Sequence, residues 1–411
     1  MPLDWRALYT QAEAKVREAL QRAEQQAQDL TTALALLQSW SPDEARARVR
    51  AILETYTPLS LTLRTAWPIE DDLALAQGRC PYGAALQPRP YGRACPPAEA
   101  PSWPVRAADG SQISPDHHAA VYYGLVNLAA VHMAPGQTPH ILRRTELFSE
   151  ADLATKENDA AFIAGYRDVH ELALLGEPGP GGQRPVIGLL DGPLEFWRRG
   201  TDQDAVSLAR QYRDLLQALV QNQGILIAGY VDRPRSATVV RMLALLDMYQ
   251  AGRLPIPKPE TEPGPSANDV HQHWPNLTDA ALWQRVLAPG QRSPIFRTWV
   301  PVTAGASPGL GTHPHFFYLR LPHGLARVDI PEAVAYRPEA VDQLHQTLWH
   351  QVHIIPDRFY PYVLVRAHEE AVVRYREREQ VEALLVRLMV THQQQLALES
   401  EKKRTKRDTA A

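Results

Sequence analysis

The chain of 411 residues is long enough to bury a substantial core and to form more than one domain, and 45% of its residues are hydrophobic. Its formal net charge of −3 excludes a protein that coats nucleic acid through bulk positive charge, although a local basic channel stays compatible with it. No apolar stretch reaches the length of a membrane span and the N-terminus lacks the apolar core of a signal peptide, so we expect a cytoplasmic protein with no membrane partner.

Two features carry little functional information. Cys80 and Cys95 form neither a disulfide framework nor a metal knuckle, so we expect two reduced thiols. The basic run at 401–408 is typical of a solvated tail, although it could also contact phosphates.

The first hundred residues predict helices followed by an irregular connector. Residues 4–56 have apolar residues near helical spacing, and a second helix is expected after Ser41, which can cap it, with Glu44 completing a capping box. Residues 77–104 are rich in proline and glycine and lack periodicity. The N-terminal helices could pack on their own domain, form an oligomer contact or grip a partner.

From residue 104 the pattern predicts a mixed sheet. Three consecutive strands are followed by alternating helices and strands; the expected elements are strands at 104–109, 119–133 and 140–145, a helix at 151–175, a strand at 184–191, a helix at 204–223, a strand at 224–232 and a helix at 236–250. This order predicts an antiparallel meander joined to parallel strands by helical crossovers. It is the order of a ribonuclease H-like α/β fold, in which the first and fourth strands lie side by side and parallel.

Beyond residue 250 fewer elements are predicted. Five prolines at 254–266 indicate an extended surface loop. After it we expect a short helix at 277–287, strands at 315–321 and 325–330, and a C-terminal helical region from about 361 to 399.

Two Asp-Gly pairs stand where neighbouring strands of this sheet are expected to end. Asp109 and Asp191 would emerge at one edge of the sheet, each followed by a glycine that lets the chain turn away. Two carboxylates so close repel one another unless a cation lies between them, which favours magnesium or manganese. Asp-Gly is also a common turn dipeptide, so either copy alone would be weak evidence.

Several carboxylates are candidates for a further ligand. Glu171 lies on the helix between the strands, one turn after Arg167, so a salt bridge is the alternative to a metal role. Glu146, Glu150 and Glu157 are rivals that spacing alone does not separate from Glu171.

A histidine near the C-terminus is the last candidate. If Pro361 begins a helix, His368 lies with Leu364 on an inward apolar face, where a satisfied core histidine is the alternative to a ligand. Tyr360 could orient a phosphate or a water, or simply pack. The sequence contains no Walker-type loop, GxGxxG or GxSxG elbow, which argues against an ATPase, a dehydrogenase and a serine hydrolase.

Six sequence blocks resemble, in order, those of the NurA nuclease domain. They are AADGSQI, VIGLLDGPLEFW, AGYVDRPRSATVVRML, PGQRSPIF, FYLRL with ARVDIP, and YPYVLVRAHEEAVV. The resemblance implies three regions: an N-terminal helical region and connector at 1–102, a nuclease domain at 103–390 that contains the proline-rich loop, and a helix end with a basic tail at 391–411. In the second block Pro193 stands where the family usually has serine.

The same resemblance implies what the protein does. The expected fold is ribonuclease H-like or PIWI-like, the expected assembly a homodimer, and the expected cofactor manganese, with magnesium as an alternative. The implied activity is a 5-prime to 3-prime exonuclease on single- and double-stranded DNA and an endonuclease on single strands, acting in DNA end resection and repair with a HerA-type hexameric translocase.

Site residues follow from the matching positions. The resemblance implies metal ligands at Asp109, Glu171, Asp191 and His368, and a catalytic Tyr360 that positions the phosphate. Arg233, Arg235 and Arg292 are candidates for contacts with the DNA backbone. Two alternatives stay open: a non-catalytic adaptor of a translocase, and an RNA-directed nuclease, because no motif identifies a 2-prime hydroxyl contact.

Overall fold

The computed structural model describes residues 4–56, 59, 62–69, 103–179, 185–196, 202–221, 224–256, 264–299 and 315–392. Cys80, Cys95 and the basic run at 401–408 lie outside the described residues, as do most of the connector at 77–104 and of the proline-rich loop. The chain forms two compact units: unit 1 comprises Met1–Ala98 and Tyr230–Gln346, and unit 2 comprises Glu99–Gly229 and Thr347–Ala411.

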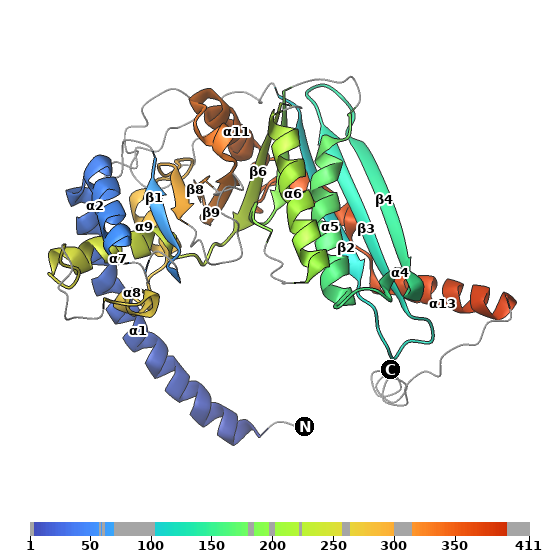
Figure 1. The fold of residues 1–411 in the computed structure, drawn as a ribbon, viewed down its shortest axis with the longest axis horizontal. Helices are drawn as coiled ribbons and strands as arrows, with labels where there is room; N and C mark the ends of the chain where they lie inside the picture. Colours follow the sequence, from blue (N-terminus) through green and yellow to red (C-terminus); the bar gives the residue numbers. More distant parts are fainter. Residues whose placement is uncertain are drawn as a thin grey trace. The chain divides into compact units, whose positions relative to one another are not determined.

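Unit 2 is built on a mixed sheet with the strand order β6-β5-β2-β3-β4 (Figure 1). Its strands are β2 (Val105–Ile113), β3 (Tyr123–Met133), β4 (His140–Ser149), β5 (Val186–Asp191) and β6 (Ile225–Asp232), with the end of β6 belonging to unit 1. β3 pairs antiparallel with β2 and β4, whereas β5 pairs parallel with β2. The predicted meander, the parallel pairing of its first strand with the fourth and hence the ribonuclease H-like α/β fold are confirmed.

Helices cover both faces of this sheet. Those of unit 2 are α4 (Glu150–Leu153), α5 (Asp159–Gly176), α6 (Gln203–Gln221), α12 (Tyr362–Ala371) and α13 (Tyr375–Thr391). α5 and α12 each pack against β2 and β3. Because both faces are covered, β3 is buried along nearly its whole length, and its residues from Gly124 to Val131 are apolar except for Asn127. The edge strand β4 instead exposes charged residues at Arg143 and Arg144, a composition that discourages pairing with another chain.

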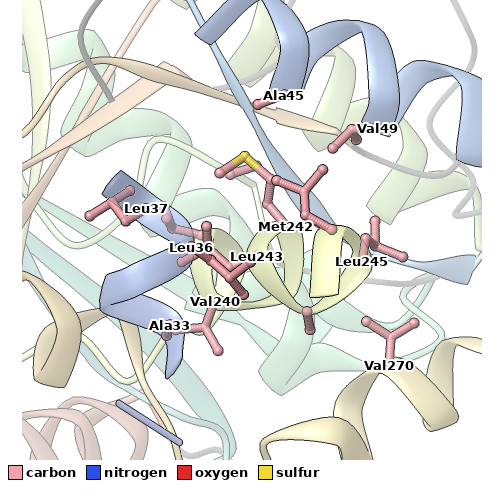
Figure 2. Packing of buried hydrophobic residues seen from close by; sticks show 14 of the residues in the cluster. Ala33, Leu36, Leu37, Ala45, Val49, Val240, Met242, Leu243, Leu245 and Val270 are labelled. Atoms are coloured by element: carbon pink, nitrogen blue, oxygen red, sulfur yellow. The ribbon is translucent and has the colours of Figure 1, made fainter. Parts of the chain in front are cut away.

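Unit 1 is organised around α7 (Thr238–Gln250), which is apolar on most of its surface and is therefore enclosed by other elements. Figure 2 shows side chains of α1 (Trp5–Ser39), α2 (Pro42–Thr55) and α8 (Ala267–His273) packing with those of α7. The remaining elements are α9 (Asp279–Val286), α10 (Glu332–Ala335), α11 (Pro338–Gln351), whose last residues belong to unit 2, and the strands β1 (Thr65–Pro68), β7 (Phe296–Trp299), β8 (His315–Leu321) and β9 (Gly324–Ile330).

The N-terminal helices follow the sequence prediction. Ser41 caps α2: its hydroxyl accepts a hydrogen bond from the Glu44 amide at 3.3 Å, and the Ser41 amide donates to the Glu44 carboxylate at 3.2 Å. The predicted capping box is therefore confirmed. The end of α1 and the whole of α2 contribute buried residues to the unit 1 core, among them Leu37 and Val49.

Several predicted elements differ from the observed ones. The helix expected at 151–175 is divided into α4 and α5, because Asn158 caps a new helix through the Ala161 amide. The C-terminal helical region is divided between α12 and α13, since Val372 adopts an extended conformation. β1, β7, α8, α10 and α11 were not predicted. No helix in the described ranges is long and apolar enough to cross a membrane.

Candidate functional site

Asp109 lies within β2 and not at its end. The strand continues through Gly110 and Ser111, which pair with Leu128 and Asn127 of β3, so the expected turn at Gly110 is wrong. The parallel partner β5 does stop here: its pairing with β2 ends at Ala108 and Leu190, which Asp109 and Asp191 directly follow in their strands. Asp191 ends β5 as predicted, and Gly192, with φ of 109°, turns the chain away in a conformation that favours glycine.

Consecutive residues of β2 face opposite sides of the sheet, so the candidate residues around Asp109 divide between its two faces. Asp109 and Ser111 face α12, whereas Gly110 faces α5. The two sides of the sheet therefore contribute different candidate residues.

On the α12 side, His368 contacts Asp109. Its Nδ1 lies 2.8 Å from Asp109 Oδ2, and Asp109 Oδ1 accepts a hydrogen bond from the Gly110 amide at 2.8 Å. The His368 side chain is 64% exposed and that of Asp109 is 16% exposed. The expectation that His368 lies among inward apolar residues is therefore wrong. On α12 its side chain faces Asp109 of β2 and the solvent.

The C-terminal end of α12 is fixed by hydrogen bonds from β2 and β3. The Ser111 hydroxyl donates to the Ala371 carbonyl at 2.6 Å and accepts from the Val373 amide at 2.9 Å. Asn127 Nδ2 donates to the same carbonyl at 2.8 Å, and Thr145 of β4 donates to Asn127 Oδ1 at 2.7 Å. This chain of contacts holds the helix one turn beyond His368 and so sets where the imidazole lies.

On the α5 side, Glu171 lies behind Gly110. A Cβ added to Gly110 would lie 2.7 Å from Glu171 Oε1, so only glycine leaves room for this carboxylate. Arg167 Nε lies 3.0 Å from Glu171 Oε1, and an Arg167 terminal nitrogen lies 2.8 Å from Asp168 Oδ1. The salt bridge considered from the i, i+4 spacing is thus present.

The pKa of Glu171 is raised well above its usual range. Burial is the largest cause; the Arg167 guanidinium opposes it, and the charges of Asp109, Asp168 and Asp191 raise the pKa further. The Arg167 pKa is also raised, since its neighbouring carboxylates outweigh the opposing effect of burial. The charges of both strand aspartates therefore act on the Glu171 pKa, although Glu171 packs on the other side of β2.

The other candidates occupy separate places. Glu146 lies on β4, Glu150 begins α4 and Glu157 is exposed in the link to α5. Tyr360 is half-buried just before α12, and the preceding Phe359 has a left-handed backbone, with φ of 46°.

The arginines proposed for DNA contacts divide into two classes. Arg233 and Arg235 are exposed in unit 1. Arg292 is 2% exposed and donates to the Ser293 carbonyl at 2.9 Å, so its proposed contact with a DNA backbone is wrong.

A divalent ion suits the chemistry of the donors gathered here. Asp109, Asp191 and Glu171 offer the carboxylate oxygens that magnesium and manganese prefer, and His368 adds an imidazole acceptable to manganese. Burial raises the Glu171 pKa most, and a bound cation would compensate the charges of Asp109, Asp168 and Asp191 that raise this pKa further. Within the described ranges no three His, Cys, Asp or Glu side chains are already arranged as a metal site. His368 instead contacts Asp109, and Glu171 pairs with Arg167.

Sequence reasoning missed Asn127 and the role of Ser111. Asn127 is the one uncharged polar side chain in the otherwise apolar run from Gly124 to Val131, and that was the available signal. Its partner on α12 lies 244 positions away, so the sequence alone did not identify what it holds.

Comparison with known proteins gives a match over most of the chain. The model of the NurA domain matches residues 104–373, which includes β2, α5, β5 and α12. None of the curated proteins compared with the chain matches it.

Three solved structures are among those that match the chain. The NurA nuclease from Sulfolobus solfataricus has a TM-score of 0.44 and 12% identity, covering 84% of this chain and 92% of that one. Endonuclease V from Ciona intestinalis has a TM-score of 0.31 and 12% identity over 69% of this chain and 87% of its own. The catalytic domain of human Endonuclease V has a TM-score of 0.30 and 12% identity over 69% and 84%. The domain match alone decides the assignment: this chain belongs to the NurA family of nucleases.

Proposed function

We propose that this chain is a manganese-dependent DNA nuclease whose ion is held by Asp109, Asp191, His368 and Glu171. The observation that carries the proposal is the meeting of Asp109 with His368 at the point where β5 ends at Asp191. When bound, a divalent ion stabilises the negative charge that develops on the phosphate oxygens during hydrolysis.

The protein's own residues then have distinct parts. His368 orients the Asp109 carboxylate from the exposed side, where a phosphate backbone can approach. Glu171 contributes a desolvated carboxylate through the space left by Gly110. Tyr360, at the start of the segment that leads into α12, positions the scissile phosphate.

The details of the proposed activity rest on what membership of the NurA family implies. We propose 5-prime to 3-prime exonuclease activity on single- and double-stranded DNA, endonuclease activity on single strands, and action in end resection with a HerA-type hexameric translocase. The absence of a nucleotide-binding loop in the sequence is compatible with a partner that supplies the motor. We also propose that the working form is a homodimer.

The test is cleavage of end-labelled single-stranded DNA and of RNA with manganese, magnesium or EDTA. Asp109→Ala and Asp191→Ala are compared with Asp214→Ala, which removes an exposed carboxylate of α6. We expect manganese-dependent shortening of DNA that only the first two substitutions abolish. Equal cleavage by all three variants would contradict the metal assignment. Cleavage of RNA alone would favour the RNA-directed alternative, and no cleavage with or without the translocase would favour an adaptor.

A further inference from the structure

The first part of α1 carries an apolar stripe that no other described residue covers. The large apolar side chains at Trp5, Leu8, Tyr9, Val16 and Leu20 are each at least 44% exposed. Figure 1 shows this part of α1 running out past the other elements of unit 1 toward the N-terminus. An exposed row of this kind on a helix is typical of an interaction surface.

The stripe is the continuation of the face by which α1 packs on unit 1. Its residues recur three or four positions apart: Trp5, Tyr9, Ala12, Val16, Leu20, Ala23 and Ala27. The same spacing continues through Leu30, Leu34 and Leu37, which contact the core of unit 1. The exposed part ends where Asp29 becomes buried.

Resting on the homodimer of the proposed function, we propose where its two copies meet: this stripe pairs with the same stripe of the second copy, in an antiparallel helix pair whose two-fold axis passes Val16. A two-fold contact uses the same patch on both copies, so the patch must be complementary to itself. Residue sizes and charges along α1 meet that condition.

The sizes complement one another in the antiparallel register. Trp5 lies opposite Ala27 of the second copy, Tyr9 opposite Ala23, and Leu20 opposite Ala12. Large side chains thus face small ones, the arrangement that packs two helices without voids. A parallel pair would instead set Trp5 against Trp5 and Ala23 against Ala23. Large side chains would then crowd one end of the helix pair, and voids would remain between the alanines at the other end.

The charges beside the stripe show the same symmetry. Along one flank the sign alternates from Arg6 to Glu13, Arg17 and Glu24. Reversing the second helix brings Arg6 near Glu24 of the second copy and Arg17 near its Glu13, so each cation meets an anion. Within α1 itself Arg17 pairs with Glu13 at 2.6 Å, so the contact between copies would extend this pair into a network. On the other flank Lys15 and Arg22 form ion pairs with Glu18 at 2.9 and 3.7 Å.

The available area is adequate for a specific contact. The two aromatic residues of each copy contribute about 150–250 Å² apiece when buried, and with Val16 and Leu20 the pair reaches on the order of 1,000 Å². Trp5 of the second copy would lie opposite Ala27, before the buried Asp29, so the overlap uses all of the exposed stripe.

Disulfide crosslinking tests the register directly. In the full-length chain with Cys80→Ser and Cys95→Ser, single cysteines are introduced as Val16→Cys, Tyr9→Cys and Ala23→Cys, with Ala14→Cys on the opposite face as the matched control. Each is oxidised and analysed on a non-reducing gel. We expect Val16→Cys to crosslink with itself, and Tyr9→Cys to crosslink with Ala23→Cys in a mixture but not alone. Adding Val16→Glu to both members of the mixture should remove that crosslink, because it places two carboxylates at the axis.

Two outcomes would overturn the proposal. Crosslinking of Tyr9→Cys with itself would mean a parallel pair. Crosslinking of Val16→Cys no greater than that of Ala14→Cys would mean that the stripe does not meet a second copy and is left for a different protein. Val16 is exposed on a helix away from the core, so these variants are expected to melt at the temperature of the parent chain.

Discussion

The Asp109 carboxylate and the His368 imidazole, 259 positions apart in the sequence, meet at 2.8 Å on one side of β2. The contact depends on Ser111, two residues after Asp109, which bonds to the backbone at the end of the helix that carries His368. The aspartate and the serine of the DGS motif thus act on the same helix.

Removing the imidazole should affect activity much more than stability. His368→Ala is expected to lower DNA cleavage by about tenfold or more, because Asp109 loses the group that orients it. Since the side chain is 64% exposed, the free energy of unfolding should change by less than about 0.5 kcal/mol. Cleavage assays and urea denaturation measure the two effects. Glu369→Ala, at the neighbouring exposed position, is the control; equal loss of activity in both variants would argue against a specific role for His368.

Ser111 is predicted to be a positioning residue. Ser111→Ala removes a donor to the Ala371 carbonyl and the acceptor of the Val373 amide, which should cost about 1–2 kcal/mol of stability and shift α12. Manganese affinity, measured by calorimetry, should fall with it, whereas Ser111→Thr keeps the hydroxyl and should restore both. Unchanged manganese affinity in the alanine variant would show that the hydrogen bonds do not position the site.

The space at Gly110 gives a prediction for Glu171. Gly110→Ala would place a methyl group 2.7 Å from Glu171 Oε1 and 2.8 Å from Leu128 Cδ2, so the carboxylate must move. Overpacking of this kind costs about 1–3 kcal/mol. The matched control is Gly124→Ala on β3, whose methyl group would have apolar nearest neighbours, Ile163 Cδ1 at 2.9 Å and the proline ring of Pro115 at 3.4 Å. DNA cleavage should fall more in Gly110→Ala than in Gly124→Ala at equal loss of stability. A larger fall in Gly124→Ala would show that Glu171 takes no part in cleavage.

A pH dependence of stability is expected from His132. Burial lowers its pKa to about 4, and the nearby Arg106, whose Nη2 lies 2.9 Å from His132 Nδ1, adds to the effect together with His140. The folded protein therefore keeps this imidazole neutral while the unfolded chain takes up a proton below about pH 6.5.

The contribution of neutral His132 to the free energy of unfolding is fully present above about pH 6.5. It is lost as the pH falls toward 4, with a slope of up to about 1.4 kcal/mol per pH unit. Urea denaturation of the parent chain and of His132→Gln at several pH values measures the difference between them, which should shrink as the pH falls. His392→Gln, at an exposed position after α13, is the control. A difference that does not change with pH would show that His132 titrates normally in the folded state.

Much of the fold follows from local pattern. The apolar runs of β3 and β5 and the helical spacing of α6 and α7 predict the elements, and their order predicts that β2 and β5 are parallel neighbours. β1 and β7 were missed because each has four residues, and Thr65 meets Trp299 only through the tertiary fold. A four-residue strand is too short for a periodic signal.

The site was predictable in its residues more than in its geometry. Asp191 ends its strand as expected, but the continued pairing of Gly110 and Ser111 with β3 keeps Asp109 inside β2. His368 was expected inside because its helical face is apolar; the contacts that turn it toward Asp109 come from Ser111 and Asn127, which no local pattern links to α12. Such long-range hydrogen bonds leave no periodicity in the sequence.

The most direct measurement is calorimetric titration of manganese into the purified chain and into Asp109→Ala, Asp191→Ala and Glu171→Gln, with Asp214→Ala as control. We predict saturable binding to the parent chain and to the control, and affinity at least about tenfold weaker in the three site variants. Binding of equal affinity in all five proteins would contradict the assignment of these carboxylates as the metal site.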